Sequence, residues 1–287
     1  MAGSHRLRKI AIVGVGLIGG SIGMAARRRR LADQVIGIGR RESSLRIAKR
    51  RGAVTATTTN LAEGVAEADL IVVCTPVEAI VDAVQQVAAS CPARALITDA
   101  GSTKAEIVAT LERGLPRGAH YVGSHPMAGS EQNGPQHASE DLLVGRTVIM
   151  TPTRQTSGAD RSRLRRFWEA LGARVVELSP REHDRRIATV SHLPHLVAAT
   201  LAASATPADL EYVASGWLDT TRIAAGDVDL WEQIVRTNSA HVLKSLSRFE
   251  TLLNSVREAI AEGDYRRLRK ILKEAKRKRD AAAGPTS

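Results

Sequence analysis

Aromatic side chains are scarce in this sequence, which limits what the chain can bind. Phe, Trp and Tyr make up 3% of the 287 residues, whereas hydrophobic residues as a whole make up 43%. Val, Ile, Leu and Ala therefore have to fill the core. Proteins that bind single-stranded nucleic acid stack the bases on aromatic rings. The composition therefore argues against a nucleic-acid partner.

Cysteine is also rare, and its spacing excludes the common metal motifs. Only Cys74 and Cys91 are present, so we expect no metal site. Such low usage fits a reducing compartment, and we expect a cytoplasmic protein. Residues 10–26 are apolar and follow basic residues, as in a signal peptide. They include five glycines, however, and their removal would delete a strand and a phosphate loop. We expect no transmembrane segment and no membrane partner.

Acidic residues are outnumbered, with 30 Asp and Glu against 41 Lys and Arg, a net charge of +11. Much of the excess is local, in the basic runs 27–30 and 266–279. A positive surface can attract nucleic acid, membranes or small anions. The chain has few aromatics, and an anionic substrate and cofactor explain the positive charge just as well.

The chain is long enough for two domains of ordinary size. Short apolar runs alternate with helical stretches over residues 1–178, as in a doubly wound parallel sheet. The predicted strands are residues 9–13, 34–38, 53–57, 69–74, 95–98, 120–122, 147–150 and 174–178. We therefore predict an α/β Rossmann-type dinucleotide-binding domain over 1–178.

The pattern changes at Ser179, which can cap a helix with Pro180 at its first position and Glu182 closing a capping box. No strand is predicted beyond this point, so residues 179–287 should form an all-α substrate and dimerisation domain. Apolar residues recur at helical spacing over 230–262. This face suits either the core of the domain or the seam of a homodimer.

A glycine-rich turn follows the first predicted strand and opens a helix. It reads Gly14-Val15-Gly16-Leu17-Ile18-Gly19. Gly14 permits the tight turn, Gly16 lets a pyrophosphate approach the backbone, and Gly19 lets helix and strand pack closely. The start of the helix offers free N–H groups to phosphate. Gly14, Gly16, Leu17, Ile18 and Gly19 are thus candidate cofactor-binding residues, and Thr75 and Pro76 join them from the end of the fourth strand.

The residues after the second strand bear on the choice of cofactor. An acidic side chain there would bind the ribose 2′-hydroxyl of NAD. Instead, Gly39 stands at that position and Arg40 and Arg41 follow. Arginine suits a 2′-phosphate, so we predict NADP. Glu42 could still reach a ribose, which leaves NAD as the alternative.

Three peptides further along are rich in reactive side chains. They are Gly123-Ser124-His125-Pro126-Met127-Ala128-Gly129-Ser130-Glu131, Ser191-His192-Leu193-Pro194-His195 and Asp219-Thr220-Thr221-Arg222-Ile223-Ala224. With the glycine loop and Asp99–Lys104, they closely resemble the prephenate/arogenate dehydrogenase family, in order and over nearly the whole chain. The resemblance implies oxidative decarboxylation of prephenate or arogenate on the route to tyrosine, at the junction of a Rossmann domain and a helical dimerisation domain.

The proposed reaction needs a base with a pKa near neutrality, which histidine supplies. His125 is our candidate; we expect it in a loop after a strand, because Pro126 disfavours a helix there. The resemblance makes His125 catalytic and places it near Ser102, which could also simply cap a helix. The resemblance also implies that Arg222 binds the substrate carboxylate. Asp219, three residues earlier, could orient the Arg222 side chain.

The remaining candidates lie in the second and third peptides. Ser191 and His195 lie four residues apart on one helical face, and the resemblance brings both to the substrate. We add Ser124 and His192 to the substrate-binding set, although His192 could equally only pack. His195 is the histidine that arogenate-specific members of the family can lack, so prephenate is favoured.

Other functions fit the sequence less well. A reductase of the same architecture acting on a β-hydroxy acid or an imine would leave the His125 peptide unexplained. A non-catalytic dinucleotide-sensing protein would need the glycine loop alone. Ser102 does not lie in a G-x-S-x-G turn, which argues against a hydrolase. The spacing of His125, His192 and His195 gives little support for a metal site.

Overall fold

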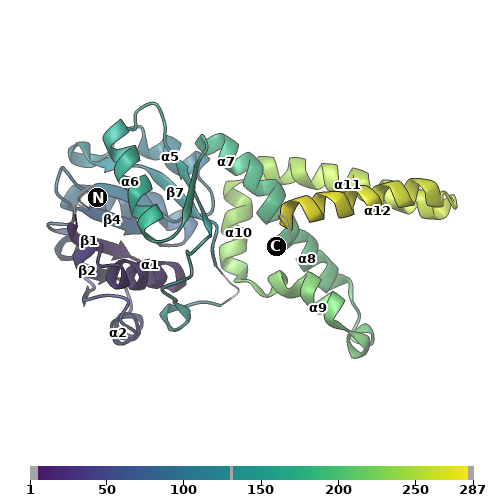
Figure 1. Cartoon of the computed structure of the whole chain (residues 1–287), viewed down its shortest axis with the longest axis horizontal. Helices are drawn as coiled ribbons and strands as arrows, with labels where there is room; N and C mark the ends of the chain where they lie inside the picture. Colours follow the sequence, from purple (N-terminus) through teal and green to yellow (C-terminus); the bar gives the residue numbers. More distant parts are fainter. Residues whose placement is uncertain (1–5, 130–131, 284–287) are drawn as a thin grey trace. The chain divides into compact units, whose positions relative to one another are not determined.

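The computed structural model describes residues 6–129 and 132–283, and its first part is built on a parallel sheet (Figure 1). Six strands lie in the order β3-β2-β1-β4-β5-β6, and every pairing is parallel. Their bounds are β1 Leu7–Val13, β2 Ala32–Ile38, β3 Ala56–Thr58, β4 Leu70–Val73, β5 Leu96–Asp99 and β6 His120–Tyr121. The predicted Rossmann-type sheet is confirmed.

Helices cover both faces of this sheet. On one face, α1 (Leu17–Arg28) and α6 (Gly158–Ala170) share a core around Ile22 and Trp168. On the other, α3 (Leu61–Val65), α4 (Ile80–Ser90) and α5 (Ala105–Leu111) surround Val84 and Ile107. A short helix, α2 (Glu42–Arg50), follows β2. Burial on both faces is why the strands lack polar alternation.

A second, smaller sheet carries a feature that the sequence did not predict. It has the order β7-β8-β9, with β7 (Gly123–Pro126) antiparallel to β8 (Thr147–Thr151) and β8 parallel to β9 (Arg174–Glu177). His125 pairs with Ile149 and therefore lies in a strand, so the expectation of a loop was wrong. Gly-Ser-His-Pro has no apolar run; pairing with distant β8 makes it a strand.

The described residues after Leu178 are helical, as predicted. They form α7 (Pro180–Ile187), a π-helical turn (Ala188–His192), α8 (Leu193–Ser204), α9 (Ser215–Thr221) and α10 (Val228–Thr237). Ser179 caps α7 by accepting the N–H of Glu182. The Glu182 carboxylate binds Arg185 and Arg186 instead of returning to the backbone, so only half of the predicted capping box forms.

The apolar stretch 230–262 is divided between two helices. Asn238 has non-helical φ and ψ of −130° and 25° and ends α10, and α11 runs over Ser239–Ala261. The described residues up to Ser239 form one compact unit, while those from Ala240 onward, with α12 (Tyr265–Ala283), form another. The functional boundary after Leu178 stays a prediction.

One helical run meets the length and hydropathy of a membrane span, namely Pro180–Ser204. We had expected none. This run contains His183 and Asp184, which are 0% and 1% exposed. Both side chains are hydrogen-bonded within the first unit. A single such helix is weak evidence for a membrane, because the interior helix of a folded domain has the same composition.

Candidate active site

The glycine loop joins β1 to α1 in a conformation that requires two of its glycines. Gly14 has a φ of 93°, and a Cβ there would lie 2.6 Å from the carbonyl oxygen of Cys74. A Cβ on Gly19 would lie 2.2 Å from the carbonyl oxygen of Gly14. A side chain at Gly14 would push the loop away from the residues that follow β4, and one at Gly19 would push α1 away from the loop. The loop therefore holds the helix start close to the ends of β1 and β4.

Gly16 differs from these two because it faces open space. A Cβ built on Gly16 meets nothing within 4 Å, and Gly16 caps α1 without any side-chain hydrogen bond. The first N–H groups of this 12-residue helix are thus directed at an open cavity with the positive end of the helix dipole behind them. These residues fit the pyrophosphate of a dinucleotide.

The cavity in front of the loop has a volume of about 520 Å³. Eight of the residues predicted from the sequence line it, namely Gly16, Leu17, Ile18, Gly19, Thr75, Pro76, Ser102 and His125. The hydroxyl oxygen of Thr75 is buried and has no hydrogen-bond partner among the described residues. Phosphate-loop residues and the candidate base therefore share one cavity.

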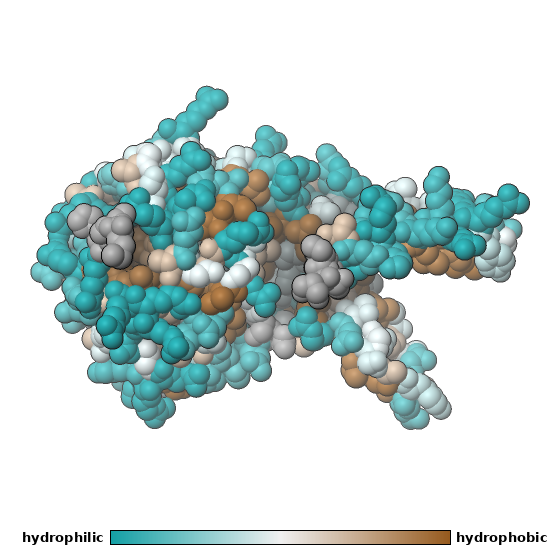
Figure 2. Space-filling model, viewed as in Figure 1, coloured by the Kyte–Doolittle hydropathy of each residue, from teal (hydrophilic) through white to brown (hydrophobic). Residues whose placement is uncertain are grey.

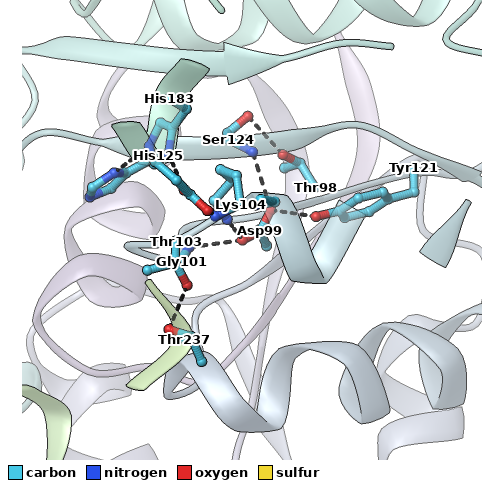
Figure 3. Close-up of polar contacts among 12 residues, drawn as sticks. Thr98, Asp99, Gly101, Thr103, Lys104, Tyr121, Ser124, His125, His183 and Thr237 are labelled. Carbon is cyan, nitrogen blue, oxygen red and sulfur yellow. Dashed lines mark hydrogen bonds and ion pairs between the residues drawn. The ribbon is translucent and has the colours of Figure 1, made fainter. Parts of the chain in front are cut away.

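His125 reaches this cavity from β7 with only 8% of the residue exposed. Its Nδ1 lies 2.9 Å from Nε2 of His183, which is fully buried on α7 (Figure 3). His183 Nδ1 lies 2.7 Å from Oδ1 of Asp184. The imidazole is therefore held from behind by an element from the other side of the predicted domain boundary.

Asp184 also fixes the turn that carries Ser102. Its Oδ1 accepts the backbone N–H of Lys104 at 2.8 Å, and its Oδ2 accepts that of Ala105 at 2.8 Å. These N–H groups belong to the N-cap residue and to the first residue of α5, so Asp184 supports the helix start that the sequence allowed Ser102 to cap. Ser102 is instead left half-buried at the cavity.

A second buried network lies beneath the same turn. Asp99 Oδ1 accepts the Tyr121 hydroxyl at 2.8 Å and the backbone N–H of Ser124 at 3.1 Å. Asp99 Oδ2 accepts the Gly101 N–H at 2.9 Å and forms an ion pair with Lys104. Both charged side chains are 0% exposed. A charge pair this deep must be fully hydrogen-bonded to be tolerated, and it joins β5 to β7.

These surroundings set the charge of the histidines. Burial, followed by the charges of His183, Lys104 and His192, lowers the pKa of His125 well below its usual 6.5. Burial also lowers the pKa of His183, against the opposing effect of Asp184. It lowers the pKa of His192 to about 4. All three imidazoles are therefore neutral at pH 7, and His125 is able to accept a proton.

Comparison with known proteins identifies the family of this chain. Residues 22–177 match the family model described as the nucleotide-binding domain of prephenate dehydrogenase. Residues 179–274 match the model of its dimerization domain. The chain belongs to the prephenate dehydrogenase family.

Similar proteins include members with different named substrates. The chain is 34% identical to the cyclohexadienyl dehydrogenase of Zymomonas mobilis, over 90% of this chain and 91% of that protein. It is 32% identical to the prephenate dehydrogenase of Bacillus subtilis, over 94% of this chain and 75% of that protein.

Two solved structures are also similar. One is Aquifex aeolicus prephenate dehydrogenase with hydroxyphenyl propionate and NAD+, with a TM-score of 0.88 and 33% identity; the match covers 96% of this chain and 98% of that one. The other is Synechocystis arogenate dehydrogenase, with a TM-score of 0.78 and 30% identity; the match covers 96% of this chain and 99% of that one.

Four residues predicted to bind the substrate do not line the cavity that contains His125. His195 stacks on Trp231, with ring centroids 3.5 Å apart and an interplanar angle of 11°. His192 is 1% exposed and its Nδ1 lies 3.3 Å from Nδ2 of Asn238. Ser191 is half-buried on the π-helical turn, and Arg222 is exposed directly after α9. None of these four residues lines the cavity that contains His125.

Helix α10 connects the cavity that contains His125 to the residues around His195. Leu230 of α10 lines the cavity, and the next residue, Trp231, stacks on His195. Two ring nitrogens near Trp231, His192 Nε2 and His195 Nδ1, are buried without a hydrogen-bond partner among the described residues. Unpaired polar atoms are uncommon in protein interiors, so these two nitrogens are candidates for hydrogen bonds with a ligand.

Three other predicted residues lie outside the cavity. Ser124 is fully buried, and its Oγ accepts the Thr98 hydroxyl at 2.9 Å and Trp168 Nε1 at 3.1 Å, so it ties β7 to α6. Arg40 and Arg41 are exposed after β2, where they were expected. Ser130 and Glu131, the last residues of the first peptide, lie outside the described residues.

Local sequence patterns contain only weak signals for the residues behind His125. Glu182-His183-Asp184-Arg185 resembles a solvated helix face, and Lys104 follows Ser102 as an ordinary helix start. Only tertiary packing reveals that His183, Asp184 and Lys104 are buried. Among residues 6–129 and 132–283, no group of three His, Cys, Asp or Glu side chains could hold a metal.

Proposed function

We propose that this protein oxidatively decarboxylates prephenate, with NADP as the hydride acceptor, in the cytoplasmic biosynthesis of tyrosine. The observation that carries the proposal is the position of His125 in the cavity of the glycine loop, where burial lowers the pKa of the imidazole. Membership of the prephenate dehydrogenase family supports the reaction, and the nicotinamide complex of the Aquifex structure supports the cofactor class.

In this reaction the substrate is held with its ring hydroxyl toward His125. The imidazole takes the hydroxyl proton while hydride leaves the same carbon for the bound nicotinamide. The bond to the ring carboxylate then breaks, carbon dioxide leaves, and the electron pair enters the ring. The ring oxygen becomes a phenolate and takes back a proton. Ser102, at the same cavity, orients the hydroxyl or the imidazole.

The carboxylates of the substrate require cations and donors. Arg222 can grip a carboxylate with two parallel hydrogen bonds. His195 lies on α8, which packs against the turn that begins at Arg222. We propose that Ser191 and His195 also contact the substrate, and His195 supports prephenate as the substrate in preference to arogenate. We retain Ser124 and His192 in the substrate-binding set, where they act on the shape of the site from buried positions.

Replacing His125 with Asn should remove the base while preserving the cofactor site. We expect kcat to fall by about 100-fold or more, because general-base catalysis contributes that much, while the Kd of the cofactor stays nearly unchanged. Absorbance of the reduced nicotinamide after addition of prephenate measures the rate. His137→Asn, at an exposed position, is the control. Turnover that survives in His125→Asn would place the base elsewhere, and no turnover of prephenate or arogenate by the wild type with either cofactor would end the proposal.

The choice of NADP rests on Arg40 and Arg41, which are exposed at the end of β2. Hydrogen bonds between charged groups contribute about 1.5–3 kcal/mol each. The double variant Arg40→Ala/Arg41→Ala should therefore raise the KM for NADP by about tenfold or more, with little change in the KM for NAD. Arg50 is exposed at the end of α2, the helix that follows Arg41. The control variant Arg50→Ala should leave both KM values unchanged. A wild-type kcat/KM that is higher for NAD than for NADP would contradict this preference.

We also propose a homodimer formed through the helical residues. Large apolar side chains are exposed there, among them Val190 at 66%, Leu218 at 53% and Leu253 at 55%. Figure 2 shows such apolar patches on the C-terminal helices. The match of residues 179–274 to a dimerization domain supports the same surface, since large exposed apolar patches mark interfaces.

Sedimentation should therefore give twice the 30.8 kDa mass of the chain. Leu253→Glu should shift the protein towards the monomer, because burying an unpaired carboxylate in an apolar interface is costly. A wild-type protein that sediments as a monomer at micromolar concentration would contradict the homodimer.

A further inference from the structure

The side chains behind His125 form a chain of hydrogen bonds that starts at Asp184. Both carboxylate oxygens of Asp184 accept backbone N–H groups, from Lys104 and from Ala105. Oδ1 lies 2.7 Å from His183 Nδ1 in addition. An ionised carboxylate has only acceptors, and the two N–H groups hold Asp184 in that role. The proton in this contact therefore belongs to His183 Nδ1.

This assignment fixes the next two rings. A neutral imidazole with a proton on Nδ1 has a lone pair on Nε2. His183 Nε2 therefore accepts, and its partner at 2.9 Å, His125 Nδ1, must donate. The proton of His125 then resides on Nδ1, and its Nε2 has the lone pair.

We propose that His183 is a positioning residue that holds His125 in the tautomer whose Nε2 can take the substrate proton. The consequence for turnover rests on the proposed function; the tautomer itself does not. His183 never touches the substrate, because it is fully buried behind His125.

The same chain stabilises the charge that forms during the reaction. After His125 Nε2 takes a proton, Nδ1–H continues to donate to His183, and the Asp184 carboxylate lies at the far end of the chain. The Lys104 ammonium, which opposes a positive charge on His125, is paired with Asp99. In other enzymes, a hydrogen-bond acceptor behind a catalytic histidine fixes the tautomer of the ring and stabilises the imidazolium that forms. Removing such an acceptor lowers kcat strongly.

The tautomers can be observed in the wild-type protein. Two-bond ¹H–¹⁵N correlation spectra at pH 7.5 distinguish an Nδ1–H imidazole from an Nε2–H imidazole. The signals of His125 and His183 are assigned by their loss in His125→Asn and His183→Gln. We expect both rings as Nδ1–H tautomers. An Nε2–H tautomer for either ring would overturn the proposal, whatever the activity of the enzyme.

A matched pair of variants tests the effect on catalysis. The amide of Gln reaches the position of a histidine Nε2, and its NH₂ is drawn to Asp184, so its oxygen faces His125. The shorter Asn leaves His125 Nδ1 without an acceptor. We expect kcat to fall by about 100-fold in His183→Asn, within the range for general-base catalysis, with the KM for prephenate and cofactor nearly unchanged. His183→Gln should recover most of this loss.

Thermal unfolding of both variants identifies a folding defect. A purely structural role for His183 predicts equal losses of kcat in the two variants, or losses that follow the unfolding temperature, and either result would overturn the proposal. Wild-type turnover of prephenate in the same preparation tests the proposed function separately from the tautomer.

Discussion

The contact between the Asp184 carboxylate and the start of α5 is the interaction on which the site depends. It caps the helix that follows the Ser102 turn, and it connects α7 of the helical part to the end of β5. Through His183 it also reaches His125. One buried carboxylate thus determines where the turn lies and how the base is oriented. Buried charges of this kind are costly unless fully hydrogen-bonded, and Asp184 has three donors around its two oxygens.

A second constraint is the pairing of β7 with β8. His125 is part of a strand held by Ile149 on one side and by the Asp99 hydrogen bond to Ser124 on the other. A strand position is more rigid than a loop, so the imidazole stays at the cavity that begins at Gly16. Burial in that place keeps the ring neutral. Rigidity and neutrality are what a base needs before the substrate arrives.

Local sequence patterns predicted the parts of the protein whose physics is local. The glycine loop, the parallel strands and the switch to helices at Ser179 were recovered because turn geometry, burial on both faces and capping are visible within a few residues. Motif resemblance indicated His125 and Ser102, which share one cavity in the structure. Arg222 and His195 remain predictions, because neither lines that cavity.

What the sequence could not predict depends on contacts over long separations. Strand β7 exists because β8 lies 22 or more residues further along. His183 and Asp184 look like surface residues of a charged helix, yet they meet Lys104 and His125 across 58 to 80 residues of chain. The boundary between α10 and α11 at Asn238 was not predicted, because the helical spacing of apolar residues continues across it.

The pH dependence of kcat/KM for prephenate tests the central claim, a neutral imidazole at position 125 as the base, most directly. Protonation of His125 removes the lone pair, so activity should fall as pH decreases through its pKa. Because burial lowers that pKa well below 6.5, we predict full activity at pH 7 and an acid limb of unit slope below pH 6.5. A limb centred above pH 6.5, or activity without any acid limb, would contradict the account.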